Sequence, residues 1–168
     1  MAPLTGESFF LTIAQIGLGF AGFSGLLIAL RRQPVSGWSS RETTGMRFML
    51  EHSFAIVPLA LFPSLLYYQW LGSEPRVWQI LNAALALLLV VFFVNVLLRF
   101  RRVPNPAYPK LLLFCYVIPT LILLLVEASR ACAGGSALWF GIGLIYLLVQ
   151  AAAQFWVFLA LYTKDSPP

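Results

Sequence analysis

The side chains best suited to chemistry lie within long apolar segments. Glu51 and His52 are neighbours near the start of the segment 48–70, and Glu127 lies near the end of the segment 111–128. Ionisable groups at membrane depth are costly and usually face protein or water, and histidine titrates near neutral pH. One interpretation is a proton- or cation-responsive site at Glu51 and His52, with an acidic outer vestibule at Glu127.

Local pairing is the alternative interpretation of these residues. Arg47 lies four residues before Glu51, which is the spacing of an ion pair along one helix face. Arg130 lies three residues after Glu127 and offers it a similar partner. His52 would then hydrogen-bond a backbone carbonyl. In this interpretation the charged residues stabilise their own helices and have no transport role.

Asn and Gln side chains in the other apolar segments can be interpreted in the same two ways, as part of a pathway or as structural hydrogen-bonding groups. Gln150 and Gln154 share one face of the last apolar segment, and Asn82 lies in the outer half of the third. Joined by depth and face, a candidate pathway would run through Glu127, Gln150, Gln154, Glu51 and His52. Lone Asn and Gln residues in membrane helices also serve as interhelical hydrogen-bonding groups, worth about 0.6–2 kcal/mol each.

Catalytic and cofactor chemistry has little support in the sequence. There is one histidine, which excludes multi-histidine zinc sites. The only aspartate is Asp165 near the C-terminus, so intramembrane aspartyl chemistry is excluded as well. Residues 17–22 match G-x-G-x-x-G, but a dinucleotide site also needs a preceding strand and a βαβ unit. We expect no enzyme activity, no cofactor and no metal.

The elements that position these residues follow from composition. The chain has 168 residues, of which 60% are hydrophobic and 10% charged, whereas soluble domains are about 25% charged. A transmembrane helix needs about 20 apolar residues, and the sequence offers five such runs. We predict an all-α membrane protein in which 1–168 form a single five-transmembrane-helix bundle. The predicted spans are 8–30, 48–70, 77–98, 111–128 and 137–162.

Helix-breaking and helix-capping residues set the predicted boundaries. Residues 39–42 read Ser-x-x-Glu, a capping box that opens the second helix. Residues 72–75 read Gly-Ser-Glu-Pro, which predicts a tight turn between the second and third helices. Pro58 and Pro63 should kink the second helix, and Pro119 lies near the centre of the fourth predicted span.

The positive charge of the chain, +5 at pH 7, gives the orientation. The loops after the first and third spans, the start of the second helix and the C-terminal tail hold nine Lys and Arg residues, against two in the other loops. Cytoplasmic loops carry the excess of Lys and Arg. We therefore expect a multi-pass protein of the cell (inner) membrane, with its N-terminus outside and its C-terminus cytoplasmic. Topology accounts for the basic residues without a nucleic-acid partner.

The first span carries two faces of small residues. The first face consists of Ala14, Gly17, Ala21, Ser24 and Gly25. The second consists of Gln15, Gly19 and Gly22, with Thr12 at its edge. Small residues let helices approach closely in membranes, so we expect protein on both sides of this helix, at the centre of the bundle.

These observations predict a non-catalytic packing or assembly module in the lipid bilayer. It would act alone as an oligomer or with a larger membrane complex. The alternative is a small proton- or cation-conducting channel or transporter. Cys115 and Cys132 lie at different depths and are expected to be free thiols.

Overall fold

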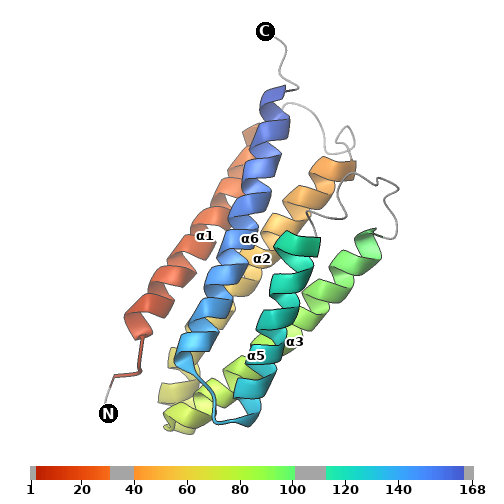
Figure 1. Ribbon diagram of the computed structural model, residues 1–168. Helices are drawn as coiled ribbons and strands as arrows, with labels where there is room; N and C mark the ends of the chain where they lie inside the picture. The colour runs from red at the N-terminus through yellow and green to blue at the C-terminus, as the bar shows by residue number, and fades with distance from the viewer. Residues whose placement is uncertain (1–2, 31–39, 101–112, 165–168) are drawn as a thin grey trace. The chain divides into compact units, whose positions relative to one another are not determined.

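The computed structural model describes residues 3–30, 40–100 and 113–164, which are mostly helical and contain no strand (Figure 1). The α-helices are α1 (Glu7–Leu30), α2 (Ser40–Leu66), α3 (Glu74–Phe100), α5 (Ile118–Cys132) and α6 (Ala137–Lys164). Two π-helical segments, η2 (Tyr67–Leu71) and η3 (Leu113–Val117), extend α2 and precede α5. The predicted capping serine, Ser39, lies outside the described residues.

Among the described residues, five helical stretches are long and apolar enough to cross a membrane, which agrees with the predicted number of spans and indicates a multi-pass membrane protein. They are Glu7–Ala29, Gly45–Trp70, Glu74–Leu98, Cys115–Cys132 and Ala137–Trp156. The fourth span ends four residues later than predicted, because Glu127, Ser129 and Arg130 do not end the helix. Most of the basic loops lie outside the described residues, so the orientation stays a prediction.

The chain divides into two compact units, which are described separately. The first unit comprises residues 1–5 and 63–143, and the second comprises residues 6–62 and 144–168. The single bundle predicted over 1–168 stays a prediction.

In the first unit, α3 packs along α5 (Figure 1). Val77, Leu81, Leu85 and Leu89 of α3 are all buried. Their four-residue spacing places them on one stripe of the helix. The turn at Gly72, whose φ is 57°, ends η2, and α3 begins at Glu74. The predicted tight turn between these helices is therefore confirmed.

Pro119 explains why the π-helical segment η3 precedes α5. Pro119 lies in the first turn of α5, directly after η3. Proline has no N–H for the regular i to i−4 hydrogen bond, so the turn before it is released from α-helical geometry. The kinks predicted at Pro58 and Pro63 stay predictions.

In the second unit, α1 contacts both α2 and the later part of α6. A Cβ at Gly17 would lie 3.2 Å from Cγ2 of Ile56 on α2. The rings of Phe20 and Phe155 are 6.1 Å apart between α1 and α6. Met46 of α2 is buried in a cluster that includes residues from all three helices. The unit is thus held by apolar packing.

Only one of the two small faces of α1 is used. On the first face, Ala14, Gly17 and Ser24 are buried, Ala21 is half-buried and Gly25 is exposed. On the second face, Thr12, Gln15, Gly19 and Gly22 are all exposed. The expectation of protein on both sides of α1 is therefore wrong for the described part of one chain. The reason is that the neighbouring helices meet Gly17 and Phe20, on the other side of α1.

Candidate functional site

Arg47 and Glu51 form the ion pair predicted from their spacing. Nε of Arg47 donates to Oε1 of Glu51 at 2.8 Å, one turn apart on α2. The two side chains are 72% and 30% exposed. An exposed pair of this kind contributes about 0.2–1 kcal/mol, so its structural contribution is small.

His52 makes the backbone hydrogen bond expected of a structural histidine. Its Nδ1–H donates to the carbonyl oxygen of Phe48 at 2.8 Å. The two rings stack with centroids 4.1 Å apart, and the His52 side chain is buried. Both contacts lie within one turn of α2, so they fix the ring against its own helix.

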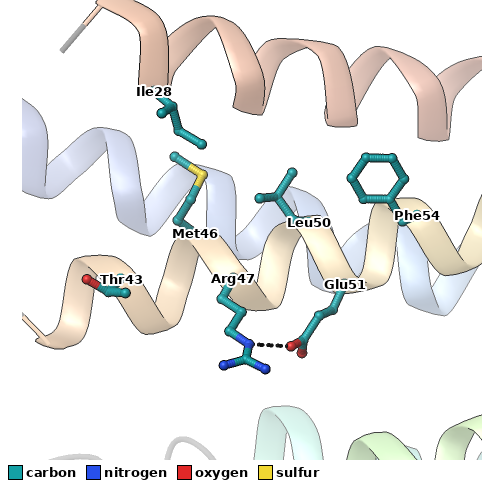
Figure 2. Close-up of a pocket in the computed structure, with 7 residues that line it drawn as sticks. All are labelled: Ile28, Thr43, Met46, Arg47, Leu50, Glu51 and Phe54. Atoms are coloured by element: carbon teal, nitrogen blue, oxygen red, sulfur yellow. Dashed lines mark hydrogen bonds and ion pairs between the residues drawn. The ribbon is translucent and has the colours of Figure 1, made fainter. Parts of the chain in front are cut away.

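A groove of about 410 Å³ lies between α1 and the start of α2. It is lined by Ile28, Thr43, Met46, Arg47, Leu50, Glu51 and Phe54. Figure 2 shows Met46, Leu50 and Phe54 on the side of α2 that faces α1, whereas the Arg47–Glu51 pair leaves the helix on the other side. The part of the groove that faces α1 is therefore apolar, and the charged groups of the pair point away from α1.

The glutamine residues of α6 lie in the second unit with α2. Oε1 of Gln154 is 3.8 Å from the point where a Cβ on Gly45 would lie, so this amide is beside the backbone of α2. Gln150 is buried one turn earlier. These placements agree with interhelical packing by the two amides. Because Glu127 belongs to the other unit, the pathway predicted to link all these residues stays a prediction.

The first unit contains a buried polar cluster made by Asn82, Glu127 and Ser136. Nδ2 of Asn82 on α3 donates to Oε2 of Glu127 on α5 at 2.7 Å. The same nitrogen donates to the carbonyl oxygen of Ser136 at 3.3 Å, and the backbone N–H of Ser136 donates to Oδ1 of Asn82 at 2.7 Å. One amide therefore links α3, α5 and the turn before α6.

Gly134 and Gly135 allow the turn between α5 and α6 to contact α3. The N–H of Gly135 bonds to the carbonyl of Arg130 at 2.7 Å, the closing bond of a Schellman motif. Gly134 and Gly135 have φ values of 109° and 76°, which suit glycine. A Cβ on Gly135 would overlap with the backbone of Trp78 and Gln79. This close approach places the next residue, Ser136, one turn along α3 at Asn82.

Glu127 is placed differently from both predictions made for it. Its side chain is 0% exposed, so it does not line an acidic vestibule. Its Oε2 accepts from Asn82, while Arg130 is exposed and the two do not form an ion pair. The Glu127 side chain points toward α3, whereas the Arg130 side chain is exposed. Thr120 of α5 and Tyr116 of η3 are buried as well.

Ser136 is the member of this cluster that sequence reasoning missed. Its hydroxyl accepts from the N–H of Trp139 at 3.4 Å, as expected of an N-cap residue directly before α6. The signal in the sequence was a serine immediately before the last apolar run. The capping pattern predicts where the helix begins, but not that Asn82 would bind the backbone there.

Cys115 and Cys132 are not joined in a disulfide, as predicted, and both are exposed. The five apolar helices of the described residues indicate an all-α, multi-pass membrane protein. Comparison of the chain with protein families, with characterised proteins and with solved structures finds no match.

Proposed function

We propose that the protein is a non-catalytic packing or assembly module of the membrane, associating with a second copy of itself or with a larger membrane complex. The observation that carries this proposal is the unused face of α1 formed by Thr12, Gln15, Gly19 and Gly22, hereafter the open face. A Cβ at Gly19 or Gly22 would meet no atom within 4 Å in the described part of the chain.

The chemistry of the open face favours another helix over lipid as its neighbour. Small residues allow two helix backbones to approach closely, and a glutamine amide hydrogen-bonds across helices. Gln15 lies within the span Glu7–Ala29 and is exposed there. Because hydrocarbon offers an amide no hydrogen bond, a partner helix would stabilise Gln15 while packing against Gly19 and Gly22.

The contacts of the second unit favour assembly over conduction. Arg47 and Glu51 are bonded to each other, and His52 is bonded to its own helix. Groups that serve a conducting pathway would instead converge on a shared polar cavity. The groove beside Arg47 is mainly apolar in its lining. The distribution of basic residues supports placement in the inner membrane with the N-terminus outside.

The experiment measures the mass of the purified protein in mild detergent by native mass spectrometry. The wild type should form an assembly larger than one chain. Gly22→Leu should fold normally, since Gly22 is exposed and a Cβ there would meet no atom within 4 Å in the described part of the chain, and should reduce the assembled fraction at least tenfold. The matched control is Ala153→Leu, which enlarges an exposed small residue on α6 and should leave assembly unchanged.

Two results would contradict the proposal. A wild-type protein that is monomeric and purifies with no other protein bound would contradict it directly. An assembled fraction that Gly22→Leu and Ala153→Leu change equally would show that the open face is not the interface.

A further inference from the structure

Glu127 is a fully buried acid of which only one oxygen has a hydrogen-bond partner. Oε2 accepts from Asn82 at 2.7 Å, whereas Oε1 has no partner among the described residues. The side chain is 0% exposed, so neither water nor a group from another protein can reach Oε1 while the unit remains packed. Such an arrangement requires an explanation, because a buried charge is costly unless it is paired and hydrogen-bonded.

The orientation of Asn82 determines which carboxyl oxygen is available. Its Oδ1 accepts from the backbone N–H of Ser136, so its Nδ2 must point at Glu127 and donate. Oε2 of Glu127 must therefore act as an acceptor. A proton on this carboxyl belongs on Oε1, the oxygen that receives no donor.

The elements packed around Glu127 supply no counter-ion. Oε1 lies 3.2 Å from the point where a Cβ on Gly143 would be, and the Leu85 side chain fills the adjoining space. Asn82 contacts Glu127 from α3, and on the α6 side Oε1 lies next to Gly143, beside which Leu85 packs; none of these three residues titrates. The charged side chains of the described part of this unit lie elsewhere. Glu74 bonds to Thr5, and Arg76 and Arg130 are exposed.

A metal ion does not suit this position. Calcium takes about six to eight oxygen ligands, and magnesium requires an octahedral shell. Oε1 instead faces the Gly143 backbone and an apolar side chain. A proton is the one cation that needs no further ligands, and binding it removes the uncompensated charge.

We propose that Glu127 is a proton-binding site, holding a proton on Oε1 at neutral pH for as long as α5 stays packed against α3 and the first turns of α6. The neutral acid keeps its hydrogen bond from Asn82, whereas loss of the proton leaves a bare charge between three helices. Packing of this unit therefore depends on proton binding. This site lies in a different unit from the open face of α1 and does not rest on assembly.

Proton binding at Glu127 determines the direction in which the stability of the first unit changes with pH. At neutral pH the folded unit holds a proton that an exposed glutamate in the unfolded chain has already released. Stability must therefore decrease as pH rises wherever the folded state binds more protons. Glu127→Gln should remove this dependence, because its amide is neutral at all these pH values and its oxygen still accepts from Asn82.

The test is infrared spectroscopy of the purified protein in detergent, comparing wild type with Glu127→Gln. At neutral pH the wild type should show the C=O band of a protonated carboxyl, and the variant should lack it. Glu51→Gln and Glu74→Gln are the matched controls, and both should keep the band. Absence of the band in wild type, or its survival in Glu127→Gln, would overturn the proposal.

A second measurement needs no variant and guards against a Glu127→Gln protein that does not fold. Wild type labelled with ¹³C at the glutamate carboxyl should show an isotope shift of the protonated-carboxyl band at neutral pH. Melting of the wild type should then begin at lower temperature in mildly alkaline buffer than in neutral buffer. A band without the isotope shift, or a melting temperature unaffected by this change, would count against the site.

Discussion

The side-chain amide of Asn82 donates to the Glu127 carboxyl at 2.7 Å, across 45 residues of sequence. The same amide also binds both the backbone N–H and the backbone carbonyl of Ser136. Hydrogen bonds from one side chain thus connect α3, α5 and the start of α6. Loss of this side chain should affect all three elements together.

Replacing Asn82 with alanine should destabilise the first unit by about 2–4 kcal/mol. The change removes the hydrogen-bond donor to the Glu127 side chain and leaves the Ser136 N–H without its acceptor, and each buried group left unsatisfied costs about 1–3 kcal/mol. Asn95→Ala is the control, since Asn95 is an exposed asparagine on the same helix. Unfolding by denaturant in mixed micelles measures both, and equal losses would refute the structural role of Asn82.

The turn between α5 and α6 offers a matched pair of glycines. Both have positive φ, but only Gly135 approaches the backbone of α3, while Gly134 meets nothing within 4 Å. Gly134→Ala should cost about 1–3 kcal/mol from backbone strain alone. Gly135→Ala should cost clearly more, because the backbone at Gln79 cannot rotate away from an added methyl group. Thermal unfolding of the two variants tests the difference, and a Gly134 variant as unstable as the Gly135 variant would contradict it.

The parts of the structure that follow from local sequence could be predicted. Five apolar runs gave five spans, since the length of a run and its lack of charge decide whether a helix crosses a bilayer. The turn at Gly72 and the Arg47–Glu51 pair depend on residues at most four positions apart. His52 also bonds within its own turn. In each case the partner lies within reach of one helical turn.

Contacts between distant segments could not be predicted in the same way. The spacing of Glu127 and Arg130 suggested an ion pair, but Glu127 pairs with a side chain on another helix. Nothing local distinguishes these two outcomes, because the choice depends on which face of α5 turns toward α3. The same limit applies to α1, where two small faces look equivalent in sequence and only one packs against a neighbour.

Leucine substitutions on α1 should separate its packed face from its exposed positions. At Gly17 an added Cβ would lie 3.2 Å from Ile56 and 3.3 Å from Val57. Gly17→Leu should therefore destabilise the second unit, since overpacking costs about 1–3 kcal/mol or more. Gly25 is exposed and a Cβ there would meet nothing within 4 Å, so the same change should leave stability within about 0.5 kcal/mol, as at other surface positions. The yield of folded protein in mild detergent measures both effects, and comparable losses at the two positions would show that Gly25 is also packed.

The two cysteines allow a direct test of the predicted orientation. Cys115 and Cys132 are the first and last residues of one span, and both are exposed. At 1.5 Å per residue they lie about 25 Å apart along the helix, close to the thickness of the hydrocarbon core, about 30 Å. With the N-terminus outside, the fourth span runs outward, which places Cys115 at the cytoplasmic side and Cys132 at the outer side.

A membrane-impermeant maleimide applied to intact cells should therefore label Cys115→Ser, which retains Cys132. It should not label Cys132→Ser until the membrane is permeabilised. The double variant, which has no thiol, is the background control, and labelling of both single variants after permeabilisation shows that each thiol is reactive. Labelling of Cys132→Ser alone in intact cells would reverse the orientation and would contradict its assignment from the basic loops.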